Sequence, residues 1–252
     1  ARLAAERALA RQKVETAIDD GDALAAPAKD KPAPTFANFD EALAALRENP
    51  NMLLVDAQAA RDFMKMLEAL GDEGTAKVLA LLESEESADR IAAAQLLLQL
   101  GDPAAIKPLG EAVINDPDAE AAAWASQALI RLDGDGAKEA LQNALANSPH
   151  EAVKVNSLWG LCRHEDPEGS ARTLAYYEDA GNNADMRRAL GLGALALNSA
   201  SVMPVVDAVS SRESDSTGIM QRVIDYYGRV PGPEATPRLI ALSQTAALSD
   251  GL

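Results

Sequence analysis

The two histidines of the chain are each followed by glutamate, at His150-Glu151 and His164-Glu165. Imidazole and carboxylate side chains are common ligands of zinc and iron, so such pairs could build a metal centre. The residues at the place of His150 in neighbouring segments of the chain are Asp118 and Asn183, so the pair does not recur. The two histidines also stand at opposite ends of one expected helix, roughly 21 Å apart. We therefore expect no shared metal site.

Other residues that could do chemistry have plainer interpretations. The run Asp133-Gly134-Asp135-Gly136 resembles the beginning of a calcium loop, but the twelfth position is Ala144 instead of the glutamate that would bind calcium through both oxygens. The single cysteine, Cys162, excludes an internal disulfide and lies in an apolar stretch, which predicts a small core residue. Neither histidine belongs to a recognisable nucleophile motif. The sequence therefore predicts no enzyme activity, no catalytic residues and no cofactor.

The elements that carry these residues repeat along the chain. Six helical runs end on an apolar residue or histidine and break into an acidic or Gly/Pro turn, after Leu70, Leu100, Leu132, His164, Leu197 and Val230. A period of 30 to 33 residues is typical of stacked helix pairs, each of which cannot bury its apolar stripe alone. Alanine occupies 52 positions, and it both favours helix and allows helices to approach closely. The predicted fold is all-α, an α-solenoid (superhelix) of stacked antiparallel helix pairs.

The same pass divides the chain into three parts. Residues 1–26 are expected to form an amphipathic helix, and residues 27–37 a Pro-rich linker in an extended conformation. The solenoid is expected over 38–252, with regular repeats at about 71–242. The N-terminal helix and a final half-repeat suggest a fragment of a longer array.

Local signals place the first and last helices of the solenoid. Asn38 is a candidate N-cap with Glu41 as its capping-box partner, which predicts a helix to about Arg47. A second helix is predicted from about Met52 to Leu70. The segment from Thr236 to about Leu248 reads as a first helix with no second helix after it.

Residues 87–145 resemble a known family. The segment at 90–109, RIAAAQLLLQLGDPAAIKPL, is similar to bacterial HEAT repeats of the type named after phycobilisome lyases, in which a V-R-x-x-A-A second helix runs into a G-D-P turn. Val153-Lys154 and Met186-Arg187 fit the V-R position, and Asp166-Pro167 echoes the turn. The resemblance covers about 71–242. It implies a HEAT-like solenoid and specifies a function poorly, because such folds host many tasks.

In HEAT-like arrays the second helices line the concave surface. Superposing the repeats places both tryptophans and several arginines on positions expected to be exposed there. Trp and Arg are enriched at binding hot spots. The candidate partner-binding residues are Trp124, Gln127, Arg131, Asn156, Trp159, Arg163, Arg188, Arg222 and Arg229. The alternative interpretation is that each Trp folds over a neighbouring helix and each Arg pairs with a nearby carboxylate.

These features favour a non-enzymatic scaffold that binds a protein or peptide partner, possibly acidic, along the concave face. The alternative is a bilin-lyase-like protein that handles a chromophore. A net charge of −16 works against binding to nucleic acid, which requires clustered Lys and Arg. No run of apolar residues is long enough for a membrane span. No signal peptide is visible, but the first residue is not Met, so the absence of a targeting signal does not decide the compartment. The cytoplasm is slightly favoured, and an exported or periplasmic protein stays open.

Overall fold

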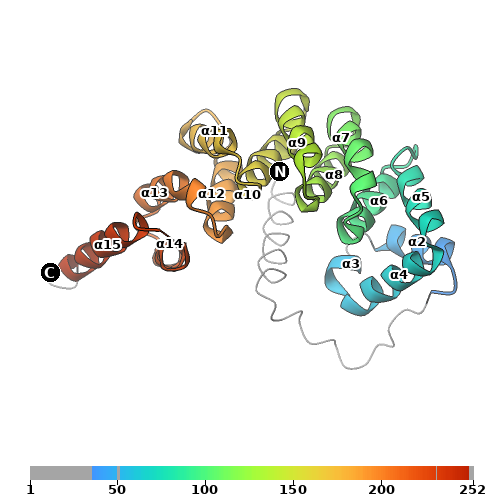
Figure 1. The fold of residues 1–252 in the computed structure, drawn as a ribbon, viewed down its shortest axis with the longest axis horizontal. Coiled ribbons are helices and arrows are strands. Elements are labelled where there is room, and N and C mark those ends of the chain that lie inside the picture. Colours follow the sequence, from blue (N-terminus) through green and yellow to red (C-terminus); the bar gives the residue numbers. More distant parts are fainter. Residues whose placement is uncertain (1–35, 50–51, 231, 250–252) are drawn as a thin grey trace. The chain divides into compact units, whose positions relative to one another are not determined.

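The structure is a computed structural model that describes residues 36–49, 52–230 and 232–249. Every regular element of these residues is a helix (Figure 1). The chain divides into two compact units between Ser157 and Leu158, inside helix α10 (Glu151–Arg163). We call the described residues up to Ser157 unit 1 and those from Leu158 unit 2. The expected helix at 1–26 and most of the expected linker at 27–37 lie outside the described residues.

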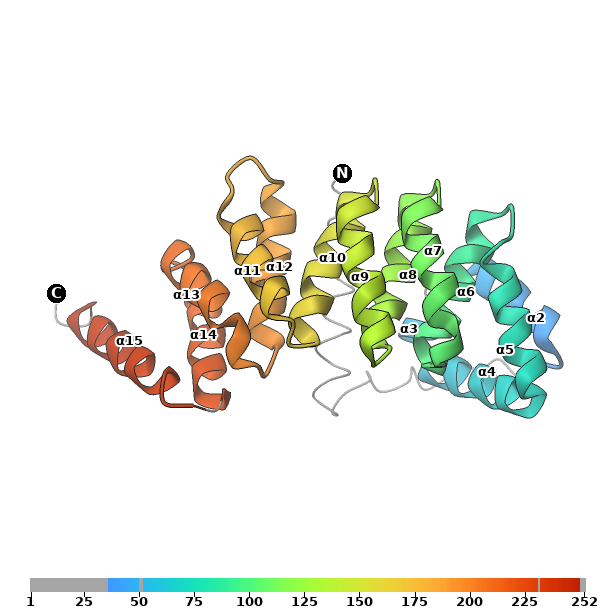
Figure 2. The same ribbon diagram turned by 45° about the horizontal axis from the view of Figure 1, so that its top comes forward.

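Unit 1 begins with an irregular repeat and continues with regular helix pairs (Figure 2). Besides the beginning of α10, its elements are α2 (Phe39–Glu48), α3 (Met52–Val55), α4 (Ala57–Leu70), α5 (Asp72–Leu81), α6 (Ser87–Leu100), η1 (Pro103–Ala105), α7 (Ile106–Asn115), α8 (Ala119–Arg131) and α9 (Asp135–Asn147). Those of unit 2, after the end of α10, are α11 (Pro167–Glu178), α12 (Ala184–Ala196), η2 (Ala200–Val202), α13 (Met203–Arg212), α14 (Thr217–Arg229) and α15 (Ala235–Ser249).

The predicted breaks between repeats are confirmed to within one residue. The second helices end at Leu70, Leu100, Arg131, Arg163, Ala196 and Arg229. Two of these ends are followed by a glycine at positive φ, Gly71 (57°) and Gly101 (63°), as is common at helix C-termini because glycine carries no Cβ. After α10 the residue at positive φ is Glu165, at 53°. The repeat boundaries therefore follow from local turn chemistry.

Side-chain caps explain where helices α2 and α4 begin. The Glu41 N–H donates to Asn38 Oδ1 at 2.9 Å, so the predicted N-cap of α2 is confirmed. Glu41 Oε2 accepts from the Ala37 N–H at 3.0 Å, so its return bond goes to the residue before the cap and not to Asn38, as a standard capping box would have it. The single helix predicted from Met52 to Leu70 is wrong. It is interrupted at Asp56, whose Oδ1 caps α4 by accepting from the N–H groups of the second and third residues of α4, at 2.9 and 3.0 Å.

In unit 1 the regular first helices pack on one another, and so do the second helices. Helix α7 lies beside α9, and α6 lies beside α8 (Figure 2). The first repeat departs from this order, since α2 packs against both α4 and α6 while α4 packs against α3 and α5. Arg47 of α2 is hydrogen-bonded through Nη2 to Asp89 Oδ2 of α6, at 2.8 Å. This bond holds the pKa of Asp89 below its usual value.

A buried ion pair ties neighbouring repeats of unit 1 together at their internal turns. Arg90 of α6 donates through Nε and Nη2 to the two carboxylate oxygens of Asp116, at 2.8 and 2.9 Å. The two side chains are 11 % and 4 % exposed, respectively. The ring Nε2 of His150 lies 2.8 Å from the Asp116 carbonyl oxygen. Polar contacts therefore link three successive repeats along this edge.

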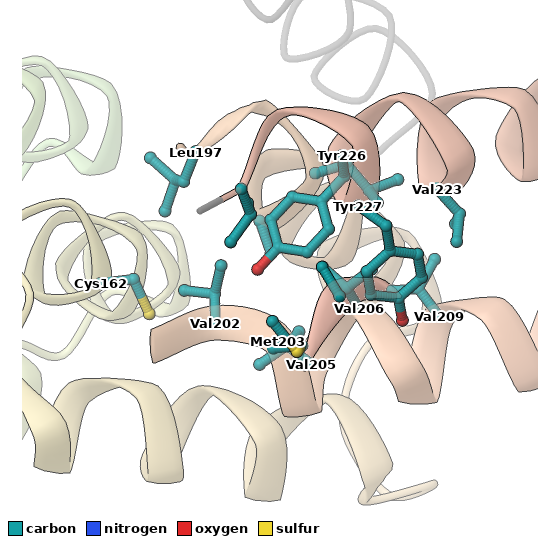
Figure 3. Packing of buried hydrophobic residues seen from close by; sticks show 14 of the residues in the cluster. Cys162, Leu197, Val202, Met203, Val205, Val206, Val209, Val223, Tyr226 and Tyr227 are labelled. Carbon is teal, nitrogen blue, oxygen red and sulfur yellow. The ribbon is translucent and has the colours of Figure 1, made fainter. Parts of the chain in front are cut away.

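Unit 2 has the same two layers, with α11 against α13 and α12 against α14. Its apolar core gathers Val202, Val205, Val206 and Tyr226 between these helices, with Cys162 at its edge (Figure 3). The Tyr226 hydroxyl donates to the Ser199 carbonyl oxygen at 2.7 Å. The second helices of unit 2 are the end of α10, α12 and α14. We call the side of these helices that is expected to be concave the second-helix face of unit 2.

The last helix, α15, is joined to this core by an ion pair. Arg238 donates to both carboxylate oxygens of Asp207 on α13, from Nε to Oδ1 and from Nη2 to Oδ2, each at 2.7 Å. Asp207 also accepts from the hydroxyl of Tyr227 on α14. The Asp207 carboxylate therefore connects three consecutive helices, α13, α14 and α15. Helix α15 corresponds to the first helix of a repeat that the sequence predicts from Thr236 to about Leu248.

Candidate functional site

Trp124 does not lie on an open face, so the expectation that it is exposed is wrong. Its side chain on α8 is 1 % exposed, and so is that of Gln95 on the neighbouring second helix, α6. The superposition of repeats assumes equal neighbours in each repeat, whereas α2 packs against α6 in the irregular first repeat. On α8 itself the flanking positions are small, including Ala121, Ala125 and Ala128, which leaves the indole ring room to be buried.

The other candidates in unit 1 differ in exposure. Asn156 is half-buried, and its Nδ2 donates to Ser126 Oγ at 2.9 Å, so this amide joins α10 to α8. Gln127 is half-buried, and Arg131 is exposed at the end of α8. Arg131 makes no hydrogen bond or ion pair with the part of the chain that the structure describes.

Trp159 in unit 2 lies against the next second helix. A Cβ built on Gly193 of α12 would stand 2.7 Å from Trp159 Cδ1 and 2.9 Å from Nε1. The ring is half-buried and packs against the apolar core of unit 2. Its N–H group donates to no acceptor among the described residues, yet it is not one of the buried unpaired atoms. The indole therefore combines a packed face with a donor that reaches the surface.

Close packing explains the Gly-Leu-Gly sequence at Gly191 and Gly193 inside α12. A Cβ on Gly191 would lie 2.7 Å from Tyr177 Cε2 and 2.8 Å from Val209 Cγ2. One glycine thus receives side chains of the first helices and the other receives the Trp159 ring. These glycines serve close packing, as their position within a predicted helix indicates.

The arginines of unit 2 differ in what they already bind. Arg163, one turn after Trp159 on α10, is half-buried, and it makes no hydrogen bond or ion pair with the described residues. Arg222 on α14 is in the same situation. Arg229 is exposed and donates to the carbonyl oxygens of Leu195, at 2.9 Å, and Asp225, at 3.3 Å. Three cationic side chains on second helices of this unit therefore lack a carboxylate partner among the residues described.

Arg188 stands apart from the other candidates on second helices. Its Nη2 lies 3.8 Å from Glu213 Oε2, so here the alternative of an Arg paired with a carboxylate holds. It sits in the first turns of α12, five residues before the glycine that meets Trp159, or roughly 7.5 Å along the helix axis.

Two further arginines near Arg188 were not among the predicted partner-binding residues. Arg187 and Arg212 both donate through Nη1 to the Tyr177 carbonyl oxygen, at 3.4 and 2.8 Å. A signal for the first existed, because Arg187 stands 26 residues before Glu213, the separation between Arg90 and Asp116. No sequence pattern indicates Arg212, since its approach to Tyr177 depends on how α13 packs against α11.

The one cysteine of the chain, Cys162, is buried in the core. Burial raises the pKa of the Cys162 thiol, which works against a reactive thiolate. Its sulfur lies 3.1 Å from Thr173 Oγ1 inside the core. Across residues 36–49, 52–230 and 232–249, no group of three or more His, Cys, Asp or Glu side chains is placed to hold a metal ion. Within the same ranges no helix has the length and apolar character needed to cross a membrane.

Part of the chain matches a known family of repeats. Residues 75–162, from α5 into α10, match the family model described as HEAT repeats. No curated protein matches the chain. The matched segment includes the Arg90–Asp116 pair and the regular helix pairs of unit 1. Residues 75–162 are therefore similar to HEAT repeats, and they lie within an all-α fold of stacked helix pairs.

Proposed function

We propose that this protein is a non-enzymatic scaffold that holds an acidic protein or peptide segment against the second-helix face of unit 2. The observation that carries the proposal is the pair Trp159 and Arg163 on α10. Positions four apart on a helix lie on the same side, so both side chains face the same ligand. Both present unpaired donors within the described part of the chain, an indole N–H and a guanidinium.

The chemistry of these groups suits a carboxylate on an apolar stem. A guanidinium binds a carboxylate through two parallel hydrogen bonds, and an indole supplies both a donor and apolar contact area. Arg222 and Arg229 on α14 extend the cationic character along the same layer of helices. All eight cationic side chains of residues 158–252 are arginines, with no lysine among them. Arg is the better residue for planar oxyanion recognition.

Binding of a labelled acidic peptide tests the proposal. The probe is a short fluorescein-labelled peptide of alternating Glu and Ala, and the comparison peptide carries Gln in place of Glu. We expect the Glu peptide to bind at least about tenfold more tightly by fluorescence anisotropy, a difference of about 1.4 kcal/mol. Raising salt from about 0.05 to about 0.3 M should weaken that binding, because screening grows with ionic strength.

A matched pair of variants locates the binding. Arg163→Gln should weaken the Glu peptide by about tenfold, since a hydrogen bond to a charged group is worth about 1.5–3 kcal/mol. The control is Arg172→Gln on α11, where the guanidinium already pairs with Glu168 at 2.9 Å. Equal affinity for the Glu and Gln peptides, or equal loss in the two variants, would refute the proposal.

The bilin-handling alternative has a separate readout. Incubation of the protein with an open-chain tetrapyrrole, followed by gel filtration, would leave a visible absorbance band on the protein if that function held. We expect no such band. A retained band that competes with the Glu peptide would replace the scaffold proposal.

A further inference from the structure

Three arginines gather at the turn end of unit 2, where α11 ends and α12 begins. Arg187 and Arg212 share the Tyr177 carbonyl oxygen as acceptor. The guanidinium carbon of Arg212 also lies 5.1 Å from the centre of the Tyr177 ring. Arg188 follows Arg187 on α12 and reaches Glu213, the residue after Arg212, at 3.8 Å. We call Arg187, Arg188 and Arg212 the arginine cluster.

The corresponding arginine of unit 1 has a carboxylate, and Arg187 does not. Arg90 is held at its Nε and Nη2 by Asp116, 26 residues later. Glu213 stands 26 residues after Arg187 but is the ion-pair partner of Arg188 instead. The Nε of Arg187 is buried and has no acceptor in the described part of the chain. The arginine Nε–H therefore donates to a carboxylate in unit 1, at Arg90, but has no described acceptor in unit 2, at Arg187. A buried donor without a partner costs free energy unless a ligand supplies an acceptor.

The cluster also carries more positive than negative charge. Among the described residues, Glu213 is the only carboxylate that forms an ion pair with any guanidinium group of the cluster, and its partner is Arg188. In the adjoining turn, Asp179 Oδ1 accepts from the Gly181 N–H at 2.8 Å, within its own loop. The Tyr177 carbonyl oxygen near the C-terminus of α11 accepts one Nη1 hydrogen bond from each of Arg187 and Arg212. The other guanidinium donors of Arg212 have no acceptor within residues 36–49, 52–230 and 232–249. Arg188 and Arg212 are exposed enough for a ligand to reach them.

We propose that the arginine cluster binds an oxyanion carried by a partner molecule, and that this oxyanion is a phosphate monoester or a carboxylate. Guanidinium forks match the spacing of oxygen atoms in both groups. Three cations against one carboxylate favour the phosphate, whose charge near neutral pH is about −1.5 to −2. The site lies at the beginning of α12, apart from the Trp159–Arg163 pair, so it does not depend on the proposed acidic-peptide surface.

Side-chain NMR of the arginines tests this site directly. The protein is titrated with inorganic phosphate, with acetate and with chloride at matched ionic strength, while the Nε–Hε signals are followed. We expect saturable shifts of the Arg187 and Arg212 signals with phosphate, weaker saturable shifts with acetate, and none with chloride. Tighter binding of acetate would identify the oxyanion as a carboxylate. Shifts that chloride reproduces equally would overturn the site.

Two variants with opposite expected signs separate a binding role from a structural one. Arg188→Gln should weaken phosphate binding by about fivefold, because it removes an exposed charge worth about 1 kcal/mol. Glu213→Gln should strengthen binding by about the same factor, since it removes the competing carboxylate. Arg172→Gln, outside the cluster, should change nothing. Phosphate affinity that is unmoved by Glu213→Gln, or lowered by it, would contradict the proposal even if every variant folds.

Discussion

Gln95 offers the sharpest test of the packing of unit 1. Its side chain on α6 is 1 % exposed, and neither its Nε2 nor its Oε1 has a hydrogen-bond partner among the residues that the structure describes. Replacement by methionine keeps the length and approximate volume of the side chain while it removes both polar atoms. We therefore expect Gln95→Met to stabilise the protein, although most core substitutions destabilise.

The size of the effect follows from the two unsatisfied atoms. Each buried polar group left without a partner costs about 1–3 kcal/mol, and an imperfect fit of the new side chain costs up to about 1.5 kcal/mol. The net expectation is about 2 kcal/mol, or a rise in melting temperature of about 4–8 °C for a protein of this size.

The assay is urea unfolding followed by circular dichroism. A higher midpoint with an unchanged slope would report a true gain in stability. The control is Gln99→Met, because Gln99 is exposed on the same helix and its replacement should stay within about 0.5 kcal/mol. If Gln95→Met, but not Gln99→Met, lowers the free energy of unfolding by about 1 kcal/mol or more, the amide of Gln95 has a hydrogen-bond partner and the reasoning is refuted.

Three other changes have defined outcomes. Glu165→Gly should stabilise by about 1 kcal/mol in urea unfolding, since φ is 53° and a Cβ is disfavoured there, whereas Glu165→Ala should not. Gly193→Ala should cost about 1–3 kcal/mol and shift Trp159 fluorescence, because the new Cβ meets the indole at 2.7 Å; Gly228→Ala, with nothing within 4 Å, should be neutral or stabilising. The hydrogen bond from Arg47 lowers the pKa of Asp89 in the folded protein. The ionised carboxylate therefore contributes to stability above the unfolded pKa of about 4, and this contribution is lost as the pH falls through the folded pKa. Unfolding midpoints of Asp89→Asn should therefore fall less between neutral and acidic pH than those of the wild type, and parallel curves would count against that cause.

The repeat boundaries were predictable because local residues decide them. A glycine such as Gly101 ends a helix by its own backbone freedom, and Asn38 begins one by its own side chain. The break at Asp56 was missed for a related reason, since an aspartate can be a helical residue or a cap and the sequence of a short apolar run does not decide between them.

The exposure of single side chains was not predictable in the same way. Trp124 and Trp159 were both expected on the exposed side of second helices, yet the first is 1 % exposed and the second keeps an indole N–H at the surface. The difference depends on which neighbours each helix meets, such as Gly193 opposite Trp159. Periodicity gives the face of a helix but not what covers it.

A charge reversal tests the central claim, that an acidic segment binds the second-helix face of unit 2. The double variant Arg163→Glu/Arg222→Glu and the wild type are each titrated with the Glu–Ala peptide and with a Lys–Ala peptide of equal length, using fluorescence anisotropy. The account predicts that the wild type binds only the acidic peptide and that the variant loses it and gains the basic one. Retained binding of the acidic peptide by a folded variant would contradict the account.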